Sequence, residues 1–300
     1  MERKQRMLVV VGAPSSAGSY AAGQESAPRV LREHAIVERL RENRREVVDV
    51  GDGPFQIWAP DAAHPLAQNV GQVVASVTTL AHDVGAALDV GADVLVLGGS
   101  CLVALGVMSA LASLAQDSCL LYVDRHSDLN TPVTTTDGSL DWMGIAHLLG
   151  VPGAIPELLD ALGPAPLLTP DRVHLLGIEP EASTVGERRI RADLGLAMTT
   201  NAELAANPSA ATVKVLSTFR QGPLAVHLDV DVLDFTDAPL AEDTGGRNTG
   251  PTLAAVTKAL HVACHDQRFR VLSVGEINPT RSIGDSDAID RFVEALVGLF

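Results

Sequence analysis

The sequence predicts an α/β fold in which alternating strands and helices build one mostly parallel, doubly wound sheet. Short apolar runs alternate with longer helical patterns along the chain, and this alternation is typical of parallel sheets covered by helices. No repeat, low-complexity linker or internal boundary interrupts the alternation, so residues 1–300 are expected to form a single domain. Three apolar runs are followed directly by acidic, imidazole or thiol side chains, which places the candidate chemistry at strand ends.

The bulk composition limits the classes of partner. The 300 residues are 46% hydrophobic and carry a formal net charge of -15 with no long basic block, so nucleic acid and anionic membranes are not expected partners. No apolar run approaches the ~20 residues that span a bilayer. The three cysteines are scattered and imply no disulfide framework, so a reducing cytoplasm is the expected location.

The strands are predicted from short apolar runs bounded by polar or glycine residues. In chain order they are Met7–Val11, Glu46–Val50, Asp93–Gly98, Leu120–Val123, Val173–Gly177, Met198–Thr200, Ala225–Asp234 and Arg270–Val274. The loops Gly12–Ser26, Thr131–Asp141 and Leu233–Gly250 are longer than a simple connection requires, and loops of that length often line sites.

The helices are predicted from apolar residues at helical spacing. They are Ala27–Arg45, Asn69–Asp89, Leu102–Ala115, Trp142–Leu149, a charged helix containing Arg188–Asp193, Asn207–Thr218, Leu253–Ala263 and Ala288–Leu299. The first of these has Ser26 as its expected N-cap and Pro28 in its first turn.

The first candidate site follows the strand Leu120–Val123. Asp124, His126 and Asp128 come at alternate positions, which lie on one side of an extended chain. Ligands bind at the carboxyl ends of strands in open α/β sheets, and carboxylate with imidazole suits a divalent ion such as Mn, Zn, Fe or Ni. The motif is short, and a polar loop with a capping aspartate is the alternative.

The second candidate site lies in Ala225–Asp234. A period of two puts His227, Asp229 and Asp231 on one face of the predicted strand. Acids buried side by side repel each other and are costly unless a cation neutralises them. Two such motifs together predict a metal centre, with enough carboxylates for two ions that share ligands and a water.

Two more groups come at predicted strand ends. Cys101 follows Gly98-Gly99-Ser100, where it is either a metal ligand or a buried structural cysteine. Glu276 follows the last strand and adds another carboxylate.

Four segments together resemble the ureohydrolase family of arginases and agmatinases: GGSC (Gly98–Cys101), DRHSDLN (Asp124–Asn130), DVDVLD (Asp229–Asp234) and EINP (Glu276–Pro279). The resemblance implies a three-layer α/β/α fold and two manganese ions per chain. It also implies hydrolysis of a linear C–N bond in a guanidino compound by metal-bound hydroxide, giving urea or a urea derivative and an amine. A homo-oligomer, either a trimer or a hexamer, is expected by the same resemblance.

The resemblance also implies the ligand set, which is Cys101, Asp124, His126, Asp128, Asp229 and Asp231. In this set, Asp124 and Asp229 would bridge both ions. His126 and Asp231 would complete the coordination of one ion, and Cys101 and Asp128 that of the other.

Further roles follow from the resemblance. Asp128 would hydrogen-bond the nucleophilic hydroxide, Glu276 would pair with the substrate guanidinium, and Asn130 would lie near the distal end of the substrate. Asp234 would orient a ligand from behind.

The sequence departs from the family pattern at the metal site and in the loops. Cys101 stands where the family has histidine, and a thiolate favours Zn over Mn, with Fe or Ni as further alternatives. Ser100 replaces an acid beside it. Asp141 stands where the arginase branch has a histidine that donates a proton. Asp141 would be a general acid only with a raised pKa, and the alternative is a cap for the helix starting at Trp142.

The segment Ile178–Ser183 replaces the one by which arginases contact the amino acid end of arginine. A modified guanidine such as N-hydroxyarginine is therefore one expected substrate, and an ordinary arginase or agmatinase activity is the alternative. His227 is expected behind the ligands, as a compensating ligand or as a hydrogen-bonded core residue. The other class of function is a relative without activity that acts as a binding or structural subunit.

Overall fold

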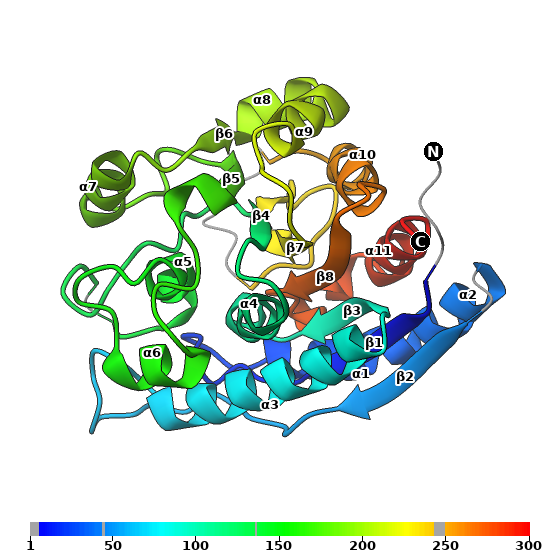
Figure 1. The fold of residues 1–300 in the computed structure, drawn as a ribbon. Helices are drawn as coiled ribbons and strands as arrows, with labels where there is room; N and C mark the ends of the chain where they lie inside the picture. The colour runs from blue at the N-terminus through cyan, green and yellow to red at the C-terminus, as the bar shows by residue number, and fades with distance from the viewer. Residues whose placement is uncertain (1–5, 44–45, 136, 243–249) are drawn as a thin grey trace.

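The computed structural model describes residues 6–43, 46–135, 137–242 and 250–300. Its eight named strands form one sheet, in the order β2-β1-β3-β8-β7-β4-β5-β6, with every neighbouring pair parallel (Figure 1). The strands are β1 (Leu8–Ala13), β2 (Val47–Asp52), β3 (Asp93–Gly98), β4 (Cys119–Val123), β5 (Val173–Ile178), β6 (Met198–Thr200), β7 (Leu224–Asp229) and β8 (Phe269–Gly275). The predicted parallel α/β sheet is confirmed.

Helices cover both faces of this sheet, which gives three layers (Figure 1). One face carries α3 (Val70–Asp89), α4 (Val103–Leu114), α5 (Gly144–Leu148) and α6 (Pro156–Leu162). The other carries α1 (Ala27–Glu33), α2 (Ile36–Asn43), α8 (Asn201–Ala206), α9 (Pro208–Leu216), α10 (Leu253–Cys264) and α11 (Ala288–Val297). The helix α7 (Val185–Leu194) lies beyond β5, near the β6 edge (Figure 1). Within the described ranges no helix is both long and apolar enough to cross a membrane.

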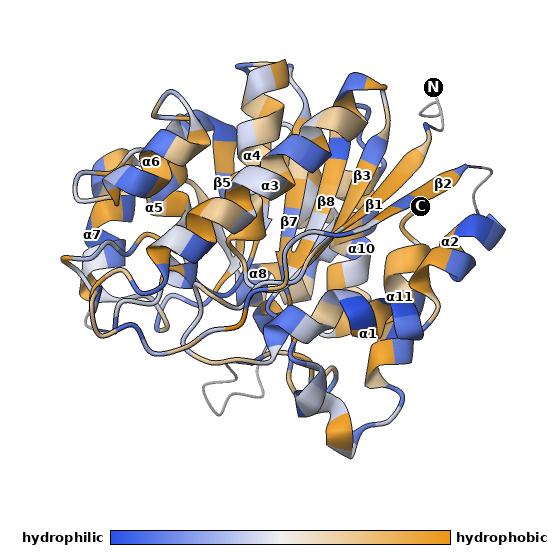
Figure 2. Ribbon diagram, turned by 90° about the horizontal axis from the view of Figure 1, so that it is seen from below, coloured by the Kyte–Doolittle hydropathy of each residue, from blue (hydrophilic) through white to orange (hydrophobic). Residues whose placement is uncertain are grey.

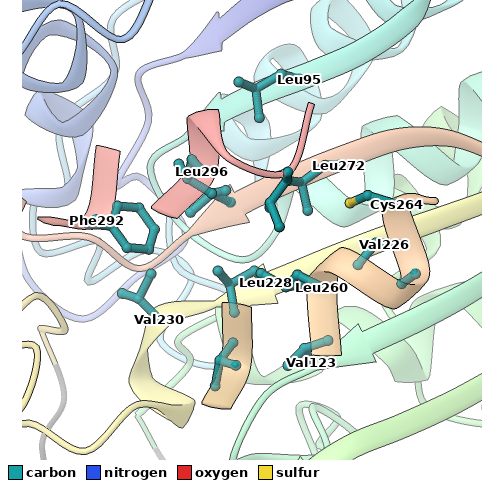
Figure 3. Packing of buried hydrophobic residues seen from close by; sticks show 14 of the residues in the cluster. Leu95, Val123, Val226, Leu228, Val230, Leu260, Cys264, Leu272, Phe292 and Leu296 are labelled. Atoms are coloured by element: carbon teal, nitrogen blue, oxygen red, sulfur yellow. The ribbon is translucent and has the colours of Figure 1, made fainter. Parts of the chain in front are cut away.

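The core is divided by the sheet into two layers because the side chains of each strand alternate between its faces. Val94 and Val96 of β3 pack with α3 and α4, whereas Leu95 and Leu97 pack on the opposite side. Figure 2 shows the strands as mostly hydrophobic ribbons, as expected for a parallel sheet buried on both faces. Figure 3 shows one layer, where Leu228 and Leu272 meet helices α10 and α11.

The predicted helix Ala27–Arg45 is wrong as a single element. It is two helices, α1 and α2, separated at Ala35, whose φ of 59° ends the first. Ser26 does not cap α1 with its side chain, since its hydroxyl donates to the carbonyl of Gly23 at 2.6 Å. Residues 44 and 45 of the predicted helix, and 243–249 of the predicted loop Leu233–Gly250, lie outside the described residues.

Candidate metal centre

The four central strands place the candidate residues together. In the sheet order β3-β8-β7-β4, Cys101, Glu276, Asp229 and Asp124 each lie at or just beyond the carboxyl end of their strand. A cavity of about 330 Å³ opens there. Its lining is Tyr20, Cys101, His126, Asp128, Asp137, Asp141, Trp142, Asp229, Asp231 and Glu276. The two sequence motifs therefore meet in one cavity, as expected for ligand sites of open α/β sheets.

One ligand group joins β4 to β7. One potential ligand atom from each of Asp124, His126 and Asp231 lies within 4.8 Å of the others. The Nδ1 atom of His126 is 2.8 Å from Oδ2 of Asp231 and 3.7 Å from Oδ1 of Asp124. Oδ1 of Asp124 accepts the His126 amide at 2.6 Å, whereas its Oδ2 is buried with no hydrogen-bond partner among the described residues. A buried carboxylate oxygen without a hydrogen-bond partner is a favourable position for a bound cation.

The backbone reaches this group by a route that the period of two does not predict. Strand β7 ends at Asp229, and Val230–Val232 forms a 3-10 turn in which the Asp231 amide donates to Oδ1 of Asp229 at 2.8 Å. Likewise β4 ends at Val123, and Asp128 has a left-handed φ of 48°. The predicted strand end at Val123 is confirmed, but the predictions of a strand through Asp231 and of an extended chain through Asp128 are wrong. The convergence of these side chains is produced by turns at the strand ends.

The second ligand group joins β3, β7 and β8. One potential ligand atom from each of Cys101, Asp229 and Glu276 lies within 4.8 Å of the others. Asp128 borders this group, with its Oδ2 3.5 Å from the Cys101 sulfur. The Cys101 thiol also lies 2.9 Å from the Asp141 carbonyl oxygen. The group thus contains Glu276 in the place where the family resemblance implies Asp128.

Glu276 is anchored by protein donors. Its Oε1 accepts the Cys101 amide at 2.8 Å, and its other oxygen accepts the side-chain amide of Gln24. Glu276 itself has a φ of 67°, an uncommon conformation for a residue other than glycine. Such conformations persist where surrounding contacts hold them, and they are common at functional sites.

Burial and mutual repulsion dominate the electrostatics of the protein without metal. Burial, followed by the neighbouring carboxylates, raises the pKa of Asp124 and Asp229 well above the usual range. The pKa of the Cys101 thiol is also raised, first by burial and then by Asp128 and Glu276. A divalent cation would reverse this situation, because it stabilises carboxylates and thiolate in their charged forms.

The pKa of His126 reflects the same excess of negative charge around it. Burial alone would lower its pKa, but Asp231 and then Asp124 raise the pKa to about 9. In the metal-free protein the ring is therefore protonated at neutral pH, and its positive charge partly balances the negative charges of Asp231 and Asp124.

Asp141 lies against the second group and is buried. Burial raises its pKa to about 7, although the Trp142 amide, which donates to Oδ1 of Asp141 at 3.0 Å, lowers it. The 3-10 helix Asp141–Met143 begins at Asp141 itself, and the residue in its cap position is Leu140, so Asp141 is not the N-cap of this helix. A pKa near neutrality is what a general acid requires.

Asp124 is buried but does not belong to the cavity lining, and three further predicted residues also lie outside that lining. His227 is buried, stacks on Tyr122 and forms a 2.9 Å hydrogen bond through Nδ1 with Ser273. Asp234 accepts the amide and the hydroxyl of Thr236 and stabilises the turn after β7. The side-chain oxygen of Asn130 accepts hydroxyls of Thr134 and Thr184. Their proposed roles remain predictions.

Sequence reasoning missed several residues of the site. Tyr20, Asp137 and Trp142 line the cavity, Gln24 holds Glu276, and the hydroxyl of Tyr122 donates to Asp128. Tyr122 carried a faint signal, since it is the one aromatic residue in the aliphatic strand β4. Gln24 carried none, because nothing in a loop sequence indicates which side chain points inward.

Comparison with known proteins decides the family. The model of the Arginase family matches residues 6–296. The chain belongs to the arginase family. It is 29% identical over 307 residues to Arginase-1 of Oryctolagus cuniculus, covering 100% of this chain and 93% of that protein. It is 31% identical over 253 residues to Arginase-1 of Homo sapiens, covering 82% and 78%.

Solved structures agree with the arginase-family fold. Arginase from Bacillus subtilis matches with a TM-score of 0.85 at 23% identity, covering 98% of this chain and 97% of that one. Formimidoylglutamase from Bacillus subtilis matches with a TM-score of 0.74 at 17% identity, covering 99% and 86%. The family resemblance predicted from the four motifs is confirmed. The protein is accordingly an amidinohydrolase, a hydrolase of C–N bonds in linear amidines, and its family depends on two metal ions.

Proposed function

We propose that the protein binds two divalent ions and hydrolyses a guanidino compound to urea, or a urea derivative, and an amine. The observation that carries this proposal is the pair of ligand groups in one buried cavity, with Oδ2 of Asp124 left without a partner among the described residues. Manganese is the proposed metal by family membership. Zinc is the leading alternative because Cys101 offers a soft sulfur ligand, with Fe or Ni next.

The six proposed ligands are Cys101 and five residues of the two motifs, namely Asp124, His126, Asp128, Asp229 and Asp231. Asp124 and Asp229 would be shared, since each belongs to one of the two groups and the groups adjoin on β4 and β7. His126 and Asp231 would complete one ion, and Cys101 and Asp128 the other. Two bound ions would supply a strong nucleophile at neutral pH by lowering the pKa of a shared water.

The remaining chemistry belongs to the side chains of the cavity. Glu276 is held by Gln24 and the Cys101 amide, which would fix its carboxylate for a planar guanidinium. Asp128 would orient the attacking water. After attack, the tetrahedral carbon would expel an amine, and Asp141 would give it a proton, for which its pKa of about 7 is suited.

The substrate is proposed to enter with its cationic end toward the strand ends. Among the described residues, the cavity lining contains six carboxylates, one histidine and no lysine or arginine. An acidic cavity favours the guanidinium cation. N-hydroxyarginine, arginine and agmatine are the candidates. Asn130 is already hydrogen-bonded to two threonines, so contact with the distal end would require it to exchange a partner.

Assembly and location are proposed from the family resemblance and the composition. We expect a cytoplasmic homo-oligomer, a trimer or a hexamer, that comprises one ureohydrolase-like domain per chain. The competing function is a family member without activity that serves as a binding or structural subunit, and the replacement at Cys101 is the observation that favours it.

The test is metal content and turnover measured on the same preparation. Protein purified with added Mn²⁺ or Zn²⁺ is analysed for ions per chain, and urea release is measured with arginine, agmatine, guanidinobutyrate and N-hydroxyarginine. About two ions per chain with turnover of at least one compound is the expected result. No bound metal and no turnover, with no gain in Cys101→His, would leave the binding or structural role.

A further inference from the structure

A buried polar ladder crosses three strands beneath the candidate metal centre. Tyr122 of β4 is in register with His227 of β7, and His227 is in register with Ser273 of β8. Register partners in a parallel sheet point to the same face, so the three side chains lie side by side. All three are buried. The ladder residues are thus defined as Tyr122, His227 and Ser273.

The ladder lies between the metal centre and an apolar level on the same face of the sheet. Two residues toward the start of each strand, the same face carries Leu120, Ala225 and Val271, which are also in register with one another. All three of these belong to the hydrophobic core. Buried polar side chains cost free energy unless they are satisfied, so a polar layer at this one level requires a compensating interaction.

The ladder is connected by contacts that end on Asp128. Ser273 Oγ lies 2.9 Å from Nδ1 of His227. The His227 ring stacks on Tyr122, with 4.8 Å between ring centroids and 19° between planes. The Tyr122 hydroxyl then donates a hydrogen bond to Oδ2 of Asp128. The chain of contacts therefore leads from the centre of the sheet to a carboxylate of the cavity.

Asp128 needs such support. Its φ of 48° is strained for a residue with a side chain, and the strand has already ended at Val123. The oxygen held by Tyr122 is also the one 3.5 Å from the Cys101 sulfur. The hydrogen bond from Tyr122 therefore holds the Asp128 carboxylate in place next to Cys101. Hydrogen bonds to ligating carboxylates fix their orientation in metal sites.

Resting on the proposed function, we propose that Tyr122, held by His227 and Ser273, is a positioning residue that orients Asp128 toward the ion bound beside Cys101. The ladder fixes the orientation of the Asp128 carboxylate beside Cys101, so its effect should be larger on this ion than on the other. In the other group, Oδ1 of Asp124 accepts the His126 amide and Nδ1 of His126 lies 2.8 Å from Asp231, whereas the Tyr122 hydroxyl donates to Asp128.

The experiment titrates metal-free protein with Mn²⁺ and with Zn²⁺ by calorimetry. Tyr122→Phe removes the hydroxyl and keeps the stacked ring. The matched control is Ser109→Ala, which removes a buried hydroxyl that donates to the Leu162 carbonyl and belongs neither to the ladder nor to the cavity lining. We expect Tyr122→Phe to weaken one of two ions by about 10- to 100-fold and to leave the other ion within about threefold. The control should leave both affinities as in the unmodified protein.

Kinetics separate positioning from a general loss of structure. For Tyr122→Phe at saturating metal we expect kcat for the guanidine to fall while KM stays unchanged, because Asp128 orients the nucleophile and does not hold the substrate. The melting temperature of the metal-free protein should stay close to that of the unmodified protein. Equal weakening of both ions, or unchanged affinity for both, would overturn the proposal.

A second variant covers a failure of Tyr122→Phe to fold. His227→Phe keeps an aromatic ring on Tyr122 and removes the bond to Ser273, so it should weaken the same ion by a smaller factor. Unchanged affinity for both ions in that variant would also overturn the positioning role. The proposed function has its own contradicting result. If the unmodified protein binds two ions but hydrolyses no guanidine, the hydrolase activity is contradicted while the role of the ladder is still tested. If the unmodified protein binds no ions, both proposals are contradicted.

Discussion

The two ligand groups of the cavity share one sheet edge but differ in chemistry. Asp124, His126 and Asp231 provide oxygen and imidazole, and the ring already pairs with a carboxylate at 2.8 Å. The other group substitutes a thiol, Cys101, whose pKa is raised first by burial. A thiol must lose its proton to bind an ion, and the thiolate prefers softer metals. If both groups bind ions as proposed, the two halves of one site would select different metals.

The largest expected effect comes from Asp124, whose unpartnered oxygen belongs to the first group. Asp124→Asn should abolish binding of at least one ion and lower urea release by about 1000-fold, equivalent to about 4 kcal/mol of activation free energy. Ions per chain and turnover are the measurements. Asp290→Asn, on the surface helix α11, is the control and should leave both unchanged. Full metal binding in Asp124→Asn would show that the first group does not bind an ion through this residue.

Asp141 tests the proton transfer that accompanies the second group. Asp141→Asn cannot donate a proton, so kcat should fall by about 100-fold or more with little change in metal content. In the unmodified protein the acid must be protonated to act. Its pKa is raised to about 7 by burial, so kcat should decline as pH rises through 7. A variant with kcat and pH profile like those of the unmodified protein would exclude Asp141 as the acid.

Cys101→His would make the two groups more alike. Replacing sulfur by imidazole should shift the preference of the second ion from Zn²⁺ toward Mn²⁺ by about tenfold, or about 1.4 kcal/mol. Competition between the two metals during calorimetric titration measures this shift. Cys119→Ser, at another buried cysteine on β4, is the matched control. The same metal preference in Cys101→His and the unmodified protein would show that the sulfur is not a ligand.

The smallest expected effect is on stability without metal. The pKa of His126 is raised to about 9 by Asp231, and burial raises the pKa values of Asp124 and Asp229. Groups with raised pKa values bind protons more tightly in the folded state, so the contribution of these three residues to stability is present at low pH and is lost as pH rises. The melting temperature of metal-free protein should fall between pH 6.5 and about 9, by about 2–4 °C for each kcal/mol lost.

Added metal should remove most of that dependence, because a bound cation replaces the proton on His126 and stabilises the carboxylates. Metal-free protein whose melting temperature rises over the same pH interval would contradict the proposed electrostatics.

Much of the fold and part of the site could be predicted from the sequence. The strand Asp93–Gly98 was predicted to the residue because an aliphatic run ends in glycines, and Asp124 was located because it ends another such run. The backbone conformation of the turns beyond the strand ends could not be predicted. Asp128 adopts a left-handed φ and Asp231 lies in a 3-10 turn, and a period of two does not encode either conformation.

The support of the site was harder still to predict. Tyr122 looks like a core residue of a buried strand, and only the register of β4 with β7 places it against His227. Gln24 lies 252 positions from Glu276 in the chain, and no local pattern couples them. Residues that act through tertiary contacts of this kind leave no periodic signal.

The central claim is that both ligand groups hold an ion despite the thiol in one of them. The most direct measurement is anomalous X-ray diffraction from crystals soaked in Mn²⁺ and, separately, Zn²⁺. We predict two anomalous peaks per chain, one among Asp124, His126 and Asp231 and one beside Cys101, with the second peak stronger relative to the first in Zn²⁺. A single peak, or none, in both metals would contradict the account.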